Sequence, residues 1–211
     1  MNHIGFYVII LVIGYFCGCF QTGYFVGKLN GIDIRDYGSG NAGATNVLRV
    51  LGKKWALTTF LGDALKGFVP AMILKCLVCP GMSGVNSQLA QLLIGFGAVM
   101  GHDYPFFLKF KGGKGVSTSI AVMTAFDWRM GLASLIIFGI VLGLTRYVSL
   151  GSCLLSIGFI VEMMILHPGR PELLVMAVLF TFFIVYRHRA NIKRLMSGTE
   201  SKIGQKVEVK K

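Results

Sequence analysis

Charged residues are scarce in this sequence: they make up 14% of its 211 residues, and nine are acidic. Hydrophobic residues make up 54%, so the chain is too apolar and too poor in charge for an ordinary soluble domain. Its apolar stretches approach the roughly 20 residues that a membrane-spanning helix needs. Short segments with charge, Gly and Pro separate them. We therefore expect a polytopic membrane protein that forms a single domain over residues 1–211.

The sequence also lacks the signs of a disulfide or metal framework. Each of its five cysteines falls inside an apolar segment, where a thiol behaves as a small hydrophobe: Cys17, Cys19, Cys76, Cys79 and Cys153. The pair Cys76 and Cys79 has C-x-x-C spacing, but the predicted topology separates it from the other thiols, so a four-thiolate site is not expected. We predict no metal and no cofactor.

The net charge is +12, but proteins that bind nucleic acid carry their basic residues on a soluble fold, and the sequence shows no sign of one. No nucleic-acid partner is therefore expected. It also lacks Lys and Arg before its first apolar run, which extends from Ile4 to about Val26. That run is too long and wrongly flanked for a cleaved signal peptide. We interpret it as a retained first helix.

Hydropathy predicts an all-α protein with seven spans. They lie near residues 4–26, 55–79, 88–101, 116–127, 130–146, 148–166 and 171–186. The third and fourth are short for a bilayer, so we expect the polar stretch between them to dip into the bundle.

Basic residues indicate the orientation. Most of the 21 Lys and Arg residues lie on one side if seven spans alternate, whereas the loops of the other side hold Arg129 and Arg170. The positive-inside rule then predicts an external N-terminus and a cytoplasmic C-terminus. The predicted cytoplasmic set is Lys28, Arg35, Arg49, Lys53, Lys54, Lys109, Lys111, Lys114, Arg146, Arg187, Arg189, Lys193, Arg194, Lys202, Lys206, Lys210 and Lys211.

The first unusual cytoplasmic segment is the first glycine loop, residues 38–46, which Arg49 follows. Three glycines in six residues let backbone N–H groups converge on one point, as in an anion-binding nest. The loop also matches G-x-G-x-x-G, but membrane helices flank it instead of the βαβ unit that dinucleotide binding requires. A phosphate site is predicted, with a plain connecting loop as the alternative. The candidate neutral donors are Ser39, Asn41, Thr45 and Asn46.

The second glycine loop, residues 101–118, carries the run Gly112-Gly113-Lys114-Gly115. It is not a Walker A loop, because Lys114 is followed by Gly. Its glycines still allow close backbone approach, and its lysine supplies a mobile charge beside a helix N-terminus. Phosphate binding is again predicted. His102 in this loop is either a general base or a hydrogen-bonded structural residue.

The C-terminal basic segment, residues 187–202, follows the last span. Arg189 and Arg194 fit a snorkelling helix end. His188, Asn191 and Glu200 offer proton exchange, amide donation and a carboxylate, which a polyol phosphate would use. Ser149 and Ser152 mark the remaining cytoplasmic turn, where they bind phosphate or satisfy a helix end.

Two features lie at membrane depth. Asp63 and Lys66 are three residues apart on one helix face, and we predict a structural ion pair. Glu162 has no sequence-local partner and receives no assignment.

Together the three segments resemble the acyl-phosphate-dependent glycerol-3-phosphate acyltransferases, the PlsY-type family, in the stretches GSGNAGATNVLR, GHDYPFFLKFKGGKGVST and RHRANIKRL…GTESK. The resemblance covers nearly the whole chain. It implies transfer of an acyl group from acyl phosphate to the 1-hydroxyl of glycerol 3-phosphate, giving lysophosphatidic acid and inorganic phosphate in the first acylation of bacterial phospholipid synthesis. It also implies a multi-pass protein of the bacterial inner membrane, among membrane lipids and close to the enzyme that makes acyl phosphate.

Site assignments follow from these motifs. Catalytic roles are expected for Ser39, His102, Lys114 and Asn191. Glycerol 3-phosphate is assigned to Arg49, Lys114, His188, Asn191 and Glu200. Acyl phosphate is assigned to Ser39, Gly40, Asn41, Thr45, Asn46, Gly112, Gly113, Ser149 and Ser152. The base that takes the hydroxyl proton stays open between His102 and a phosphate oxygen of the substrates.

Two other classes compete with an enzyme. A transporter or channel for an anionic phosphorylated metabolite would also use intramembrane glycines and cations, but the sequence has no inverted repeat and its polar segments lie on one side. A scaffold that docks on anionic headgroups would not need Asn41, Asn46 or Asn191. An acyltransferase is therefore favoured.

Overall fold

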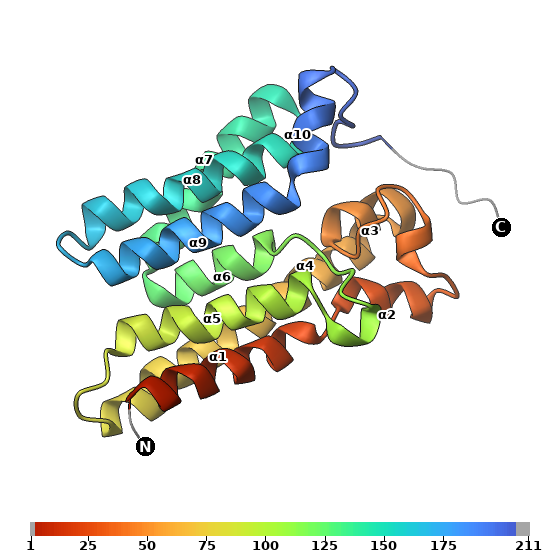
Figure 1. The fold of residues 1–211 in the computed structure, drawn as a ribbon. Helices are drawn as coiled ribbons and strands as arrows, with labels where there is room; N and C mark the ends of the chain where they lie inside the picture. The colour runs from red at the N-terminus through yellow and green to blue at the C-terminus, as the bar shows by residue number, and fades with distance from the viewer. Residues whose placement is uncertain (1–2, 206–211) are drawn as a thin grey trace.

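The protein is all-helical over residues 3–205, the range that this computed structural model describes (Figure 1). Three basic residues of the predicted tail, Lys206, Lys210 and Lys211, lie outside that range. The α-helices are α1 (His3–Cys19), α2 (Thr22–Leu29), α3 (Ala44–Leu51), α4 (Lys53–Ile73), α5 (Ser87–Asp103), α6 (Val116–Phe126), α7 (Trp128–Thr145), α8 (Val148–Leu166), α9 (Pro171–Arg187) and α10 (Arg189–Met196). Short turns η1 (Ile34–Asp36), η2 (Leu74–Val78), η3 (Cys79–Gly81) and η4 (Phe106–Leu108) join them.

Four stretches within residues 3–205 are long and apolar enough to cross a membrane: 3–29, 53–81, 128–145 and 148–166. A fifth is added if α9 and α10, which are bent by 60°, count as one. Each of the seven predicted ranges is mostly helical, but α5, with 17 residues, and α6, with 11, do not qualify as spans. The structure therefore gives an all-α bundle with four or five candidate spans.

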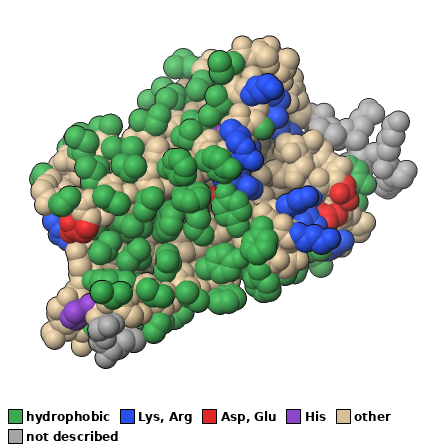
Figure 2. All heavy atoms as spheres, viewed as in Figure 1, with side chains coloured by type: hydrophobic (Ala, Val, Ile, Leu, Met, Phe, Trp, Pro, Cys, Tyr) green, Lys and Arg blue, Asp and Glu red, His purple; other side chains and the backbone are tan. Residues whose placement is uncertain are grey.

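Hydrophobic side chains cover the middle of the molecule on the face drawn in Figure 2, while Lys and Arg side chains gather mainly toward the end that carries α3 and α10. Large apolar side chains point outward from the long helices, for example Ile136 of α7 and Ile165 of α8, which are 51% and 70% exposed. An outward apolar surface of this kind is stable against lipid and not against water. The protein is a multi-pass membrane protein on this evidence.

Small residues let α1 and α5 pack closely. A Cβ at Gly18 would overlap the Ala98 carbonyl, and one at Gly97 would overlap the Leu11 carbonyl. Glycine at such positions allows two membrane helices to approach at backbone distance. The larger core cluster lies among α5, α6, α8 and α9, where Phe159 and Phe180 are fully buried.

The polar segments lie at one end of the bundle. Figure 1 places α2, α3 and α10 at that end, and the N-terminus with the α4–α5 and α8–α9 connections at the opposite end. The predicted ion pair within α4 is confirmed, with Lys66 Nζ 2.9 Å from Asp63 Oδ1 and both side chains buried. Glu162 of α8 is also buried, and neither of its carboxylate oxygens has a hydrogen-bond partner within residues 3–205.

Candidate active site

Asn46 holds the first glycine loop in shape. From the first turns of α3 its side-chain oxygen accepts from the Ser39 N–H at 2.8 Å, and its amide donates to the carbonyls of Ile34 and Tyr37 at 3.0 Å each. Gly38 and Gly40 have φ of +61° and +70°, which favour glycine. Asn46, which the sequence predicts as a donor to phosphate, therefore uses its side-chain oxygen and amide hydrogens to hold the loop itself.

The second glycine loop folds back on the end of α5. The N–H of Gly113 donates to the His102 carbonyl at 2.9 Å, and the N–H of Gly112 donates to the Asp103 carbonyl at 3.2 Å. A Cβ at Gly113 would overlap Nε2 of the His102 ring, so glycine is needed where the loop crosses that ring. The loop thereby carries Lys114 to the start of α6.

Arg187 braces this loop from the end of α9. Its guanidinium donates to the Gly113 carbonyl at 2.6 Å and to the Gly112 carbonyl at 3.2 Å, and it stacks over the Tyr104 ring at 4.9 Å. From the sequence, Arg187 is expected only as one of the cytoplasmic basic residues. Its place beside His188 was a signal, but only the fold shows that it reaches the glycines.

A chain of side-chain hydrogen bonds joins the second glycine loop to the C-terminal basic segment. Lys114 Nζ donates to Asn191 Oδ1 at 2.6 Å, and Asn191 Nδ2 donates to Glu200 Oε1 at 2.6 Å. Glu200 also accepts from Ser149 at 2.8 Å and from Arg194 at 2.7 Å. Its carboxylate therefore organises the surrounding side chains, and Arg194 gains a role beyond a snorkelling helix end.

These segments line a cavity of about 290 Å³. Polar groups form one part of its wall, and apolar side chains of α4, α6 and α7, such as Phe60, Ile120, Leu135 and Phe138, form another. The predicted site residues on its wall are Ser39, Asn41, Thr45, Asn46, Arg49, His102, Lys114, Ser149, Ser152, His188, Asn191 and Glu200.

A second space of about 270 Å³ shares Ser39, Asn41, Lys114 and Asn191 with the first. The predicted residues Gly40 and Gly112 line it, beside Lys111, Arg187 and Arg194. Gly113 lines neither space and acts through its contacts with His102 and Arg187. The structure thus brings the predicted site residues of all three segments to one place.

Burial lowers the pKa of Lys114 to about 8, although Glu200 opposes the shift. Burial alone would raise the pKa of Glu200, but the hydrogen bonds that it accepts outweigh burial and lower it. The site therefore holds a lysine that loses its charge as the pH rises through about 8, beside a carboxylate that keeps its own.

The hydrogen-bonding roles of the two ring nitrogens of His188 are defined. Its Nδ1 lies 2.8 Å from the Ile184 carbonyl oxygen, which can only accept, so Nδ1 carries the hydrogen. Burial, aided by Lys114, lowers the pKa of His188 to about 4. The ring is therefore neutral at pH 7, and Nε2 is a hydrogen-bond acceptor.

An apolar helix bundle with a cationic cavity at one end defines a multi-pass membrane protein suited to an anionic substrate with an apolar part. Comparison with known proteins identifies it further. A family model described as glycerol-3-phosphate acyltransferase matches residues 8–198. The chain is 46% identical to the glycerol-3-phosphate acyltransferase of Clostridioides difficile (strain 630) over 203 residues, covering 96% of this chain and 98% of the relative. It is 43% identical to that of Thermoanaerobacter sp. (strain X514), covering 96% and 98%.

Solved structures agree. The fold matches crystal structures of PlsY (YgiH), an integral membrane glycerol 3-phosphate acyltransferase, in its glycerol 3-phosphate form with a TM-score of 0.84 and in its lysophosphatidic acid form with 0.82. Each match has 37% identity and covers 94% of this chain and 96% of the other. The chain belongs to the PlsY-type glycerol-3-phosphate acyltransferase family.

Proposed function

We propose that this acyltransferase takes its acyl group from acyl phosphate and delivers it to the 1-hydroxyl of glycerol 3-phosphate. The products are lysophosphatidic acid and inorganic phosphate, in the first acylation of bacterial phospholipid synthesis. The observation that carries the proposal is the amphipathic cavity: cations and glycine loops meet apolar helix walls in one space. An acyl phosphate has the same two parts.

For glycerol 3-phosphate we propose Arg49, Lys114, His188 and Asn191 as ligands, with Glu200 orienting Asn191. Two phosphate groups must meet here, and two unit charges about 4 Å apart repel by about 4 kcal/mol at an effective dielectric constant near 20. Arg49 and Lys114 offset this repulsion. The Nε2 atom of His188 is an acceptor suited to a glycerol hydroxyl.

For the acyl phosphate headgroup we propose the first glycine loop as the direct contact, with Ser149 and Ser152 at the edge. Gly112 and Gly113 belong to this proposal as the glycines that shape the second loop, since their N–H groups donate to the Asp103 and His102 carbonyls. Ser39 is exposed, and the Asn41 side-chain oxygen accepts from Gly43 while its amide hydrogens have no partner within residues 3–205, so both side chains are available to a ligand. The full proposed set is Ser39, Gly40, Asn41, Thr45, Asn46, Gly112, Gly113, Ser149 and Ser152, in which Asn46 acts by holding the first glycine loop in shape. The acyl chain would lie along Phe60, Ile120, Leu135 and Phe138 toward the lipid.

In the proposed reaction the 1-hydroxyl oxygen attacks the acyl carbon, the bond from that carbon to the phosphate oxygen breaks, and phosphate leaves with the electron pair. Acyl phosphate is already activated, so no enzyme nucleophile is required, and Ser39 serves as a donor to the developing oxyanion or the phosphate. The hydroxyl proton goes to His102 or to a phosphate oxygen of a substrate, because the second pKa of such a phosphate is about 6.

We further propose seven spans, with the N-terminus outside and the site on the cytoplasmic face of the bacterial inner membrane, in one domain over residues 1–211. The polar end of the bundle carries the basic segments, which the positive-inside rule assigns to the cytoplasm. A cytoplasmic site gives access to soluble glycerol 3-phosphate. It also suits an enzyme nearby that makes acyl phosphate.

A donor comparison tests the proposal. Purified protein is given glycerol 3-phosphate with acyl phosphate, acyl-CoA or acyl carrier protein thioester, and lysophosphatidic acid is measured. Turnover with acyl phosphate alone supports the proposed donor. Turnover with a thioester and none with acyl phosphate contradicts it. Failure of all three, with glycerol 3-phosphate uptake into sealed vesicles, favours a transporter.

A further inference from the structure

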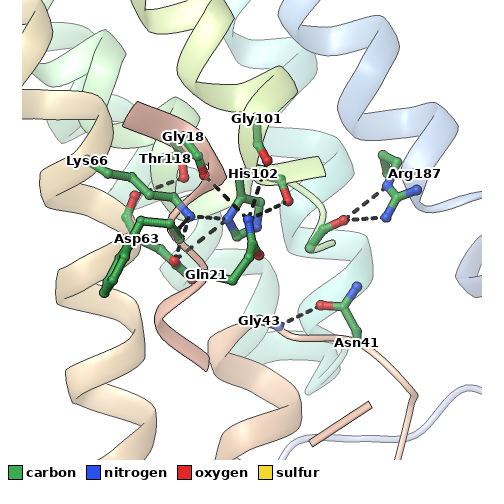
Figure 3. A network of polar contacts seen from close by, with 12 residues as sticks. Gly18, Gln21, Asn41, Gly43, Asp63, Lys66, Gly101, His102, Thr118 and Arg187 are labelled. Carbon is green, nitrogen blue, oxygen red and sulfur yellow. Dashed lines mark hydrogen bonds and ion pairs between the residues drawn. The ribbon is translucent and has the colours of Figure 1, made fainter. Parts of the chain in front are cut away.

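A buried cluster of Asp63, Lys66 and His102 lies beside the cavity (Figure 3). Asp63 is 1% exposed and His102 2% exposed, and both line the cavity wall. Lys66 lies deeper, one turn further along α4. The proposed reaction assigns this lysine no part, yet it contacts a side chain of the site.

Lys66 is surrounded by three acceptors. Its Nζ lies 2.6 Å from the Phe20 carbonyl oxygen, 2.9 Å from Asp63 Oδ1 and 2.7 Å from His102 Nδ1. The Phe20 carbonyl is available because the chain breaks there between α1 and α2. An ammonium group has three N–H donors and no lone pair. The three acceptors match a charged lysine, which the Asp63 carboxylate neutralises.

The third hydrogen bond fixes the state of His102. Its Nδ1 must supply a lone pair to Lys66 Nζ, because an ammonium group cannot accept. The other neighbour of Nδ1, Asp63 Oδ1, is 3.6 Å away, beyond ordinary hydrogen-bond distance. A second proton on the ring would set two positive groups in contact. His102 is therefore neutral with its hydrogen on Nε2.

Nε2 is the atom that faces the second glycine loop, at the point where a Cβ on Gly113 would overlap it. Gln21 holds the backbone at the same point, since its amide donates to the His102 carbonyl at 3.0 Å. The ring itself is held by Lys66 at Nδ1 and by Gly113, which packs against Nε2. Because His102 lines the cavity and its Nε2 has no hydrogen-bond partner within residues 3–205, the Nε2 hydrogen is left for a group in the cavity.

We propose that Lys66, paired with Asp63, is a positioning residue that locks His102 as the Nε2–H tautomer, so that His102 donates to a substrate phosphate oxygen and does not take the hydroxyl proton. This inference rests on the proposed function for the identity of that phosphate. The two histidines of the cavity then have opposite hydrogen-bonding roles, since Nε2 of His102 donates and Nε2 of His188 accepts.

The tautomer can be measured without turnover. Protein with ¹⁵N-labelled histidine is compared with the His102→Gln variant by NMR to assign the His102 signals. The proposal predicts a protonated Nε2, an unprotonated Nδ1, and a shift of the Nε2–H signal when inorganic phosphate is added. A protonated Nδ1, or no response to phosphate, would overturn it. Because the probe is phosphate alone, failure of the acyl phosphate donor assay does not change this result.

A second arm removes the lysine and its counter-charge together, as Asp63→Asn with Lys66→Met, which avoids leaving one buried charge unpaired. The proposal predicts that His102 loses its single tautomer in this double variant while the helical fold is retained. An unchanged Nε2–H signal would refute the role of Lys66.

Activity separates a donor from a base. Glutamine can present an amide hydrogen near the position of Nε2, whereas leucine cannot. We expect His102→Gln to lose at most about tenfold in kcat/KM and His102→Leu to lose at least tenfold more than that. Equal, large losses in both variants would mean that the proton-accepting nitrogen is essential, and would refute the donor role.

Discussion

Lys114 joins the second glycine loop to the C-terminal basic segment. It reaches Asn191 at 2.6 Å and lines both spaces of the site. Lys53, at the start of α4, is exposed and lines neither space. The two lysines therefore separate binding chemistry from membrane orientation.

We predict that Lys114→Ala lowers kcat/KM for glycerol 3-phosphate by at least about 30-fold, because a charge-assisted hydrogen bond of about 2 kcal/mol is lost in the transition state. Lys53→Ala is the matched control and should change it less than twofold. Steady-state kinetics with purified protein measures both. Equal losses would contradict this division of the basic residues.

The pKa of about 8 at Lys114 predicts a pH dependence. Below that pH the lysine is charged and binds phosphate, and above it the charge is lost, so kcat/KM for glycerol 3-phosphate should fall as pH rises through about 8. Since kcat/KM reports the free enzyme, Lys114→Arg should remove this limb, because guanidinium stays charged. A limb that persists unchanged in Lys114→Arg would assign it to another group.

At the scale of elements, the close contact of α1 and α5 sets where the site is built. It brings the break after α1 beside the end of α5, so that Phe20 and Gln21 meet Lys66 and His102. The packing depends on glycines that no larger residue can replace without movement.

We predict that Gly97→Ala lowers the free energy of unfolding by about 1–3 kcal/mol, because its Cβ would overlap the Leu11 carbonyl. Thermal unfolding in detergent should show a lower Tm. Gly139→Ala in α7 is the control, since a Cβ there has no atom within 4 Å, and alanine favours a helix. A Tm for Gly97→Ala at or above that of Gly139→Ala would contradict the packing account.

Much of this arrangement could be predicted from the sequence. Hydropathy located a helix in each of the seven predicted spans but not α3, and the Gly, Asn and Lys types pointed to phosphate chemistry in the three polar segments. The contact of Lys66 with His102 could not be predicted, because it depends on the relative rotation of α4 and α5. The engagement of Asn46 within its own loop, and the reach of Arg187 to Gly112 and Gly113, likewise depend on backbone geometry that residue types do not encode.

For the whole molecule, the proposed topology rests on the separation of the polar end of the bundle from the opposite end. Polar segments and α10 occupy one end, and the α8–α9 connection occupies the other (Figure 1). The count of spans was harder to predict than the helices themselves, since α5 and α6 are helical but short.

Labelling can test the proposed orientation. In a background with the five native cysteines replaced, Ser197→Cys after α10 and Pro168→Cys between α8 and α9 both create exposed thiols. In intact cells an impermeant maleimide should label Pro168→Cys and not Ser197→Cys, and inside-out vesicles should give the reverse. Labelling of both from the same side would contradict the proposed topology.

The most direct test of the central claim is the stoichiometry of products from purified protein. With acyl phosphate and glycerol 3-phosphate together, the account predicts inorganic phosphate and lysophosphatidic acid in equal amounts, and no phosphate release when glycerol 3-phosphate is omitted. Phosphate released without glycerol 3-phosphate, or lysophosphatidic acid formed without phosphate from that donor, would contradict direct acyl transfer within one cavity.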